Sequence, residues 1–281
     1  MGVDRIRLRD DLSILQPYPA ALLGDSLLVA DLHLGMEEDL EIQGIHVPRN
    51  VSAEVRRLVL EALELSGAEE LVILGDLKHE FGAGLHAEYR EVEELIKGAA
   101  SLRARVKLVR GNHDNYIAPV VSRLGGSVIQ DVLRVGDCCL THGHLDLRPE
   151  DLGCGCLAMG HEHPTVTLRD EVGVKHRFKA FLWGRAGMDV LVLPSPNPLA
   201  QGMPVNEVEP QDLLSPILRR FDVDSFEVYA VEPRGLVVRL ATVGALRALL
   251  HASRRIWSWP PSRWRGARST PGARRAPSRT R

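Results

Sequence analysis

Cysteine is scarce in this chain of 281 residues. Its four copies form two close pairs, Cys138 with Cys139 and Cys154 with Cys156. They are too few and too unevenly spaced for the disulfide framework of a small secreted domain, so we expect a protein of the reducing cytoplasm. A zinc site would need a second spaced pair beside Cys154 and Cys156, and the sequence has none, so we assign the cysteines no function.

Long apolar runs are also missing. The first eleven residues lack the apolar core of a signal peptide. The longest apolar stretch, residues 237–250, is interrupted by Arg239 and Arg247 and falls short of the roughly 20 residues that a membrane-spanning helix needs. We therefore expect a soluble protein without a membrane partner.

Acidic side chains are absent from the C-terminal end. The formal charge is −2, but residues 251–281 hold nine of the 35 basic residues and none of the 37 acidic ones. Residues 1–250 therefore carry 26 basic and 37 acidic side chains, a balance of −11. Because proteins that wrap a duplex place cations against its phosphates, charge alone does not predict that activity for residues 1–250.

The composition also divides the chain in two. With 44% hydrophobic residues it can bury one sizeable core, which we place in a single domain over residues 1–250. For residues 251–281 we predict a disordered tail rich in Arg, Pro and Trp. This composition fits a basic arm that stacks Trp on nucleic acid, and equally a reading frame that has run past its natural stop.

Strand and helix patterns alternate through the first half of the chain. Apolar runs at residues 27–30, 71–74 and 106–109 are typical of buried strands, and amphipathic stretches at residues 55–63 and 86–102 indicate helices between them. This order predicts right-handed crossovers and a parallel sheet. A third helix near residues 117–124 follows, and then hairpins dominate, beginning with the two-residue loop Gly136-Asp137.

A proline-rich segment interrupts the second half. Residues 194–216, PSPNPLAQGMPVNEVEPQDLLSP, contain too many prolines for regular structure over much of their length. We predict a surface loop or lid that borders the functional site.

Five short motifs of metal-binding residue types each follow an apolar run. They are Asp31 and His33, Asp76 and His79, the run Asn112, His113 and Asp114, then His142 and His144, and finally His161 and His163. Since functional groups gather beyond the carboxyl ends of parallel strands, we expect these side chains to converge. In the pairs Asp31/His33 and His161/His163, alternation along an extended segment would point both members to one side.

Such a set suits two divalent cations that share a bridging carboxylate. Oxygen and imidazole donors without thiolate fit manganese, iron, zinc, nickel or cobalt. A water shared by two cations becomes hydroxide near neutral pH and attacks phosphorus in line. The residues therefore predict a two-metal phosphoester-cleaving site.

In this order the motifs resemble those of the calcineurin-like metallophosphoesterase superfamily. The segment GHEHP and the end of the domain, to about Leu250, are similar to compact prokaryotic phosphoesterases related to the nuclease subunit of DNA-repair exonucleases. The resemblance implies an α/β fold, a four-layer α/β/β/α sandwich, over residues 1–250. It implies one metal ion on Asp31, His33, Asp76 and His163, and a second on Asp76, Asn112, His142 and His161.

The resemblance further implies that His113 donates a proton to the leaving oxygen or stabilises the charge of the transition state, with Asp114 orienting it. Many relatives carry Asp or Asn where this chain has His79, which we interpret as a residue behind the metal ligands. His79, His144 and Arg110 are candidates for substrate contacts.

The predicted activity is hydrolysis of a phosphodiester by a metal-bridging hydroxide, with two divalent ions, manganese first, as cofactors. A nucleotide or nucleic acid is the expected substrate by analogy. About 87 residues between His163 and Leu250 leave little room for a DNA-capping domain. A phosphomonoesterase or small-molecule phosphodiesterase is the enzymatic alternative, and a nucleic-acid-binding adaptor that uses the basic tail is the alternative of another class.

Overall fold

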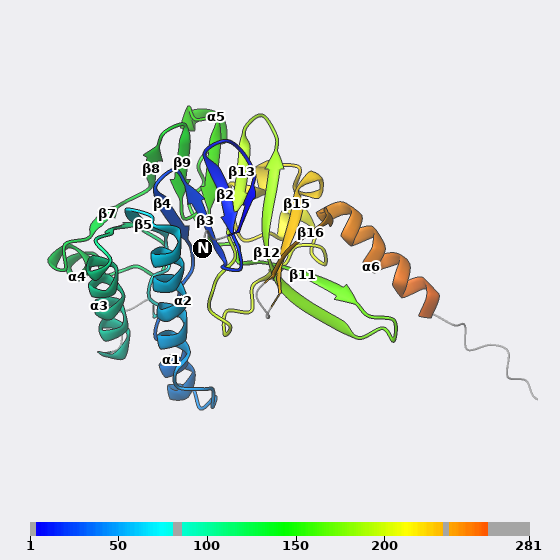
Figure 1. Cartoon of the computed structure of the whole chain (residues 1–281). Helices are drawn as coiled ribbons and strands as arrows, with labels where there is room; N and C mark the ends of the chain where they lie inside the picture. The colour runs from blue at the N-terminus through cyan, green and yellow to red at the C-terminus, as the bar shows by residue number, and fades with distance from the viewer. Residues whose placement is uncertain (1–3, 81–85, 233–235, 258–281) are drawn as a thin grey trace, which may run out of the picture.

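Two β-sheets stacked face to face form the centre of the molecule (Figure 1). The computed structural model describes residues 4–80, 86–232 and 236–257. A hydrophobic cluster lies between the sheets, and the outer face of each sheet packs on a cluster of its own.

The first sheet has seven strands in sequence order. They are β1 Arg5–Arg7, β2 Leu12–Leu15, β3 Ala20–Leu23, β4 Ser26–Val29, β5 Glu70–Leu74, β6 Arg105–Val109 and β7 Ser127–Ile129. The neighbours β4 to β7 are parallel, which confirms the predicted parallel core. The antiparallel strands β1 to β3 extend its edge and were not predicted.

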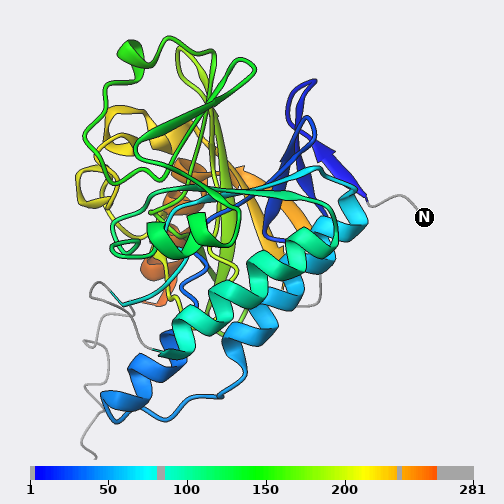
Figure 2. The same cartoon turned by 90° about the vertical axis from the view of Figure 1, so that its left-hand side faces the viewer.

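Helices cover the outer face of this sheet. They are α2 Val51–Ser66, α3 His86–Ser101 and α4 Ala118–Arg123, while the short helix α1 Met36–Ile42 lies beyond the end of α2 (Figure 1). Figure 2 shows α2 and α3 side by side, and Nε of Arg56 on α2 donates to Glu91 on α3 at 3.1 Å. The amphipathic patterns therefore located α2 and α3, while the short α1 was missed.

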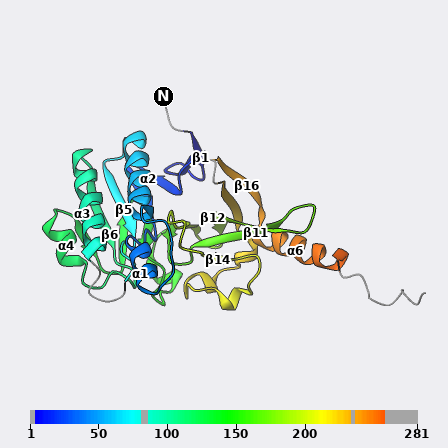
Figure 3. The ribbon, with the colours of Figure 1, turned by 90° about the horizontal axis from the view of Figure 1, so that it is seen from below.

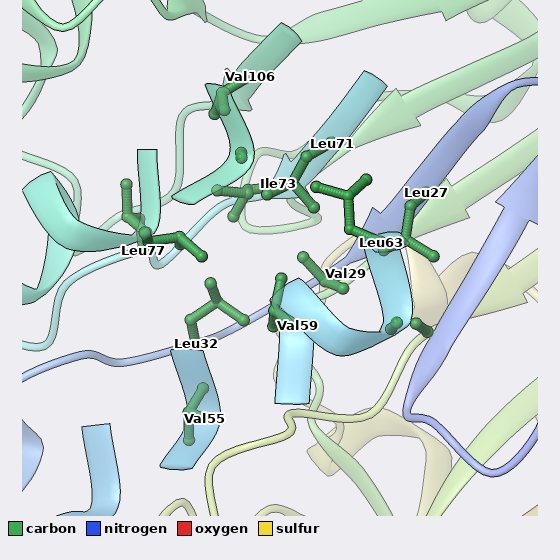
Figure 4. Packing of buried hydrophobic residues seen from close by; sticks show 14 of the residues in the cluster. Leu27, Val29, Leu32, Val55, Val59, Leu63, Leu71, Ile73, Leu77 and Val106 are labelled. Carbon is green, nitrogen blue, oxygen red and sulfur yellow. The ribbon is translucent and has the colours of Figure 1, made fainter. Parts of the chain in front are cut away.

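The packing of α2 follows from its apolar stripe. Val55, Val59 and Leu63 lie on one face of the helix and meet Val29 of β4 and Ile73 of β5 (Figure 4). Each fully buried side chain of this kind contributes about 1.5–3 kcal/mol relative to exposure. This layer fixes the strands whose carboxyl ends carry the first two motifs.

The second sheet has nine strands. Its main path is β14 Met203–Pro204, β11 Pro164–Arg169, β12 Lys175–Arg185, β13 Asp189–Val192, β10 Cys156–Met159, β9 Cys138–Thr141 and β8 Val132–Val135. The hairpin of β15 Glu227–Glu232 and β16 Leu236–Thr242 joins it through β12. The predicted Gly136-Asp137 turn is confirmed by the pairing of Val135 with Cys138.

The outer layer of the second sheet is mostly irregular. It contains the 3₁₀ turns η1 Pro210–Asp212, η2 Leu218–Arg220 and η3 Val223–Ser225, with α6 Val243–Trp257, while the one-turn helix α5 Pro149–Leu152 lies beyond β9. Figure 3 shows α6 on the side opposite α1 to α4, so the α/β/β/α layer order is confirmed. None of the helices in the described ranges has the length and apolar character needed to cross a membrane.

The end of α6 changes the expected domain boundary. The helix continues to Trp257, so residues 251–257 are helical although the disordered tail was predicted to begin at residue 251. The helical residue pattern of α6 continues past residue 251, so the change in composition does not mark the end of the helix. Residues 258–281 are outside the described part, and their disorder stays a prediction.

The cysteines also depart from expectation. Disulfides join Cys138 to Cys156 and Cys139 to Cys154, and Cys138 and Cys156 are paired neighbours on the parallel strands β9 and β10. Sequence spacing could not show that these two strands lie side by side. Because disulfides persist mainly in oxidising compartments, the cysteines no longer support a cytoplasmic location.

Candidate metal centre

The five motifs meet where strand ends of the two sheets come together. Asp31 follows β4, Asp76 follows β5 and Asn112 follows β6 in the first sheet. His142 follows β9 and His161 follows β10 in the second. Because β4 to β6 are parallel, and β9 is parallel to β10, the chain enters the site from the carboxyl end of each strand.

Four of the predicted ligands form what we call the first cluster: Asp31, His33, Asp76 and His163. Nε2 of His163 lies 3.2 Å from Oδ1 of Asp31 and 3.2 Å from Nε2 of His33. Nε2 of His33 lies 3.8 Å from Oδ2 of Asp76. The donor atoms of this cluster all lie within 4.8 Å of one another.

The second cluster contains Asp76, Asn112, His142 and His161. Nε2 of His142 lies 3.4 Å from Oδ2 of Asp76, 3.0 Å from Oδ1 of Asn112 and 3.1 Å from Nδ1 of His161. Nδ1 of His142 donates to the carbonyl of Leu74 at 2.9 Å, which leaves Nε2 directed at the cluster. Asp76 therefore belongs to both clusters.

Five of these residues have left-handed backbone: the φ angles are 57° at Asp31, 44° at His33, 52° at Asp76, 68° at His161 and 44° at His163. The extended alternation predicted for the two pairs is therefore wrong, although the pairs do converge. Non-glycine residues in this region cost free energy and persist only where their surroundings hold them. The intervening side chains point away from the donors, with Leu32 packed in the core shown in Figure 4.

The proline-rich loop holds the strained backbone of the first motif. Oγ of Ser195 donates to the carbonyl of Asp31 at 2.7 Å, and Nδ2 of Asn197 donates to the carbonyls of Leu32 and His33, each at 3.0 Å. The loop was predicted to border the site, but these residues were not singled out. Their signal is a pair of polar side chains among prolines, which fix the local backbone.

A partly buried lysine fixes this loop in turn. Nζ of Lys179 on β12 donates to the carbonyls of Ser195 at 2.8 Å and Ala200 at 3.2 Å, and also to that of Asn197. Burial lowers the pKa of Lys179 to about 8, although the carboxylate of Asp31 opposes the change. Strand β12 of the second sheet therefore supports the first cluster through this loop.

The other end of the loop ties down the last motif. Glu162, between His161 and His163, points away from the donors, and its carboxylate accepts N–H bonds from Leu214 at 3.1 Å and Ser215 at 2.9 Å. Burial raises the pKa of Glu162, although these two N–H donors oppose the change. Both ends of residues 194–216 therefore contact motif backbone or side chains.

Glycine is required where the motifs crowd together. A Cβ at Gly111 would lie 2.2 Å from Oδ1 of Asp76, and a Cβ at Gly75 would lie 2.2 Å from Nδ1 of His142. Real Cβ atoms do not approach other heavy atoms so closely. These glycines let three strand ends reach a common point.

Asp114 has a different part from the predicted one. Its oxygens accept backbone N–H bonds from Asp76 at 2.8 Å, Leu77 at 2.9 Å and Gly111 at 2.8 Å, and the side chain is 1% exposed. The His113 ring instead bonds through Nδ1 to the carbonyl of His79. Asp114 therefore joins the second motif to the third, and the expectation that it orients His113 is corrected.

His113 and His79 line the first cluster. Nε2 of His113 lies 3.8 Å from Oδ2 of Asp76, and its backbone N–H donates to Oδ1 of Asp76 at 3.0 Å. Nδ1 of His79 lies 3.3 Å from Nδ1 of His33. His33, His79 and His113 also bring donor atoms within 4.8 Å of one another.

The remaining two predicted contacts differ from each other. His144 lies beside the second cluster with its ring centroid 5.1 Å from that of His142, and its buried Nδ1 has no hydrogen-bond partner in the described structure. The Arg110 guanidinium donates to Gln130 at 3.1 Å and to Asn115 at 2.7 Å. Arg110 thus supports the loop that follows the third motif.

Proton affinity differs sharply across the centre. Burial disfavours charge on both Asp76 and His142, but their mutual attraction outweighs it: it lowers the pKa of Asp76 strongly and raises the pKa of His142 to about 9. Burial and the neighbouring His142 lower the pKa of His161 to about 4. Burial and His163 also lower the pKa of His33 well below its usual range.

The donor set fits divalent cations. Ligand atoms about 2.1 Å from one ion lie roughly 3 Å apart, which matches the separations of 3.0–3.4 Å around His142 and His163. Nε2 of His33 and Nε2 of His163 lie 3.2 Å apart, so a cation beside both atoms can accept a lone pair from each. Carboxylate, amide and imidazole donors favour a hard or borderline metal.

The chain is similar to proteins of known family and of known structure. A family model described as calcineurin-like phosphoesterase matches residues 26–226. Among solved structures, the nuclease MPE of Pseudomonas putida has a TM-score of 0.60 and 21% identity, covering 85% of this chain and 100% of that one. YfcE, a phosphoesterase from E. coli, has a TM-score of 0.40 and 20% identity, with 77% and 98% covered. A comparison with curated proteins found no match.

Proposed function

Because the chain belongs to the calcineurin-like phosphoesterase family and is a metal-dependent phosphoric ester hydrolase, we propose that it cleaves phosphodiesters with two divalent cations held by the first and second clusters. One observation carries this proposal: Oδ2 of Asp76 lies 3.8 Å from Nε2 of His33 and 3.4 Å from Nε2 of His142. A carboxylate between two groups of nitrogen donors is the bridging ligand that a two-ion site requires.

We assign the first ion to Asp31, His33, Asp76 and His163, and the second ion to Asp76, Asn112, His142 and His161. When bound, the ions supply Lewis-acid charge and activate the attacking water. Manganese suits these oxygen and nitrogen donors, as do iron, zinc, nickel and cobalt.

His113 is the proton donor in this proposal. Its Nδ1 donates to the carbonyl of His79, so Nε2 is the nitrogen that faces the clusters. Burial lowers the pKa of His113 although the carboxylate of Asp76 opposes the change, so the ring is neutral in the free protein at neutral pH. The negative charge of a bound phosphoester favours protonation at Nε2, from where the proton can pass to the leaving oxygen.

The substrate class rests on less direct support. The P. putida protein that shares the fold is a nuclease, which favours a nucleotide or nucleic acid as the diester. The charge balance of −11 over residues 1–250 favours a small phosphoester, either a diester or a monoester, because such a body repels a long polyanion. His144, with its unbonded Nδ1 beside the second cluster, is the candidate for a contact with substrate oxygen.

The test is hydrolysis by the full chain with Mn²⁺. The panel contains bis(4-nitrophenyl) phosphate, 4-nitrophenyl phosphate, cyclic nucleotides and single-stranded oligonucleotides. We expect turnover of the diester and its loss in Asp76→Asn. Asp10→Asn, which alters a carboxylate that is 97% exposed, is the matched control and should keep full activity. Oligonucleotide binding without turnover of any ester would contradict the proposal and favour the adaptor alternative.

A further inference from the structure

His79 occupies a position between a proposed metal ligand and a carboxylate. On one side, Nδ1 of its ring lies 3.3 Å from Nδ1 of His33, with the two rings at 75° to each other. On the other side, Nε2 of His79 lies 3.6 Å from Oδ2 of Asp39 on α1. The same Asp39 oxygen accepts a hydrogen bond from Nε2 of Gln43 at 2.6 Å, which holds the carboxylate in place.

Nδ1 of His33 and Nδ1 of His79 can form a hydrogen bond only if one of the two atoms carries a proton and the other does not. His33 directs its Nε2 into the first cluster, 3.2 Å from Nε2 of His163, so a cation there requires the lone pair of that Nε2. A neutral His33 must then carry its proton on Nδ1, which donates it to the lone pair on Nδ1 of His79. His79 in turn carries its proton on Nε2, directed toward the carboxylate of Asp39.

We propose that His79 is a positioning residue, which fixes His33 in the tautomer that presents Nε2 to the first ion, with Asp39 fixing the tautomer of His79. Partners of this kind behind a ligating imidazole orient the ring and raise its basicity. This inference rests on the proposed function, because it assumes that the first cluster holds a cation.

The backbone places His79 accurately for this role. Its N–H donates to the carbonyl of Leu34 at 3.1 Å, which joins the second motif to the segment after the first. Its carbonyl accepts the bond from Nδ1 of His113. Because His113 is held by the backbone, a change of the His79 side chain should leave the orientation of His113 intact.

The experiment is a calorimetric titration of Mn²⁺ into the metal-free full chain, together with metal content after desalting. We expect wild type to bind two ions, and His79→Ala to bind the first-cluster ion roughly 10–100-fold more weakly while the second-cluster ion is unaffected. His79→Asn should restore binding, because its amide oxygen stands where Nδ1 stood and accepts the same proton. Asp39→Asn should weaken the same ion to a smaller extent.

Glu41→Gln is the matched control on α1, since the Glu41 carboxylate pairs instead with Arg49 at 2.7 Å. It should bind both ions as wild type does. Unchanged Mn²⁺ affinities in His79→Ala with lowered turnover would overturn the inference and make His79 a substrate contact. Three ions in wild type and two in His79→Ala would overturn it by making His79 itself a ligand. Fewer than two ions in wild type would overturn the proposed function, and this inference with it.

Discussion

The two clusters of the metal centre share Asp76 but are prepared differently for a cation. In the first cluster, burial keeps His33 neutral, and strained backbone at Asp31 and His33 is held by side chains from a distant loop. In the second, His142 retains a proton through its attraction to Asp76, and its ring is held by a strand carbonyl. In the proposed two-ion site, the first ion would therefore depend on the loop, whereas the second would have to displace a proton.

The largest expected effect comes from filling the space beside Asp76, the residue that both clusters share. Gly111→Ala would place a Cβ 2.2 Å from Oδ1 of Asp76 and 2.5 Å from its amide nitrogen. Because Asp76 belongs to both clusters, we expect loss of both ions and a fall in turnover of at least about 100-fold, as for other displaced catalytic groups. Metal content by atomic absorption checks this. Retention of two ions would show that Asp76 does not need this close approach.

Proton displacement predicts a large pH effect confined to the second cluster. Since the pKa of His142 is raised to about 9, its ring is protonated at pH 7 in the metal-free protein and loses the proton as pH passes 9. Affinity for the second ion should therefore rise about tenfold per pH unit from 7 to 9 and then level off, with about one proton released at pH 7.

Calorimetry in buffers of different ionisation enthalpy measures that proton release. The first ion should show little pH dependence over the same range, because burial keeps His33 neutral there. Equal pH slopes for the two ions would contradict the difference drawn between the clusters.

The loop contact can be removed from the first cluster alone. Asn197→Ala removes the side-chain donor to the buried carbonyl of Leu32, which should cost about 1–3 kcal/mol, whereas the carbonyl of His33 keeps the N–H of Met36 at 3.3 Å. We expect the first ion to bind roughly tenfold more weakly. Asn206→Ala is the matched control, since buried Asn206 makes two similar bonds to the backbone of Thr167.

Thermal unfolding and Mn²⁺ titration of the two variants separate stability from metal binding. Both variants should lose a comparable free energy of unfolding. Only Asn197→Ala should also weaken binding of the first ion. Equal metal affinities in both variants would argue that the loop contributes stability alone.

The smallest expected effect on the centre comes from the disulfides. The two disulfides close nearly the same short loop, of 18 residues between Cys138 and Cys156 and 15 between Cys139 and Cys154, and together should contribute roughly 3 kcal/mol to stability. Reduction should lower the melting temperature but leave both ions bound, because β9 and β10 stay paired by backbone bonds. Thiol titration with differential scanning calorimetry checks this. An unchanged melting temperature on full reduction would contradict it.

The sequence predicts the parallel part of the first sheet and the helices between its strands, because these elements carry clear patterns. The apolar runs before Asp31 and Asp76 are buried strands, and the stripe from Val55 to Leu63 is the buried face of α2. Strands β1 to β3, of three or four residues each, were missed. Because the carboxyl ends of parallel strands meet at one edge, the convergence of the motif residues can be predicted without knowing the outer layers.

What escaped prediction depends on contacts between distant segments. Asn197 reaches the backbone at Leu32 across a sequence separation of 165 residues, and the prolines around Asn197 do not show which distant segment it contacts. Asp114 follows His113 directly, yet its carboxylate serves the backbone of the second motif. The left-handed conformation of Asp31 and His163 likewise arises from tertiary support, since neither residue type requires it.

The most direct test of the shared carboxylate is electron paramagnetic resonance of the Mn²⁺-loaded full chain together with its manganese content. We predict two ions per chain and the exchange-coupled spectrum of a pair bridged through Asp76. One ion per chain, or two ions with uncoupled spectra, would contradict it.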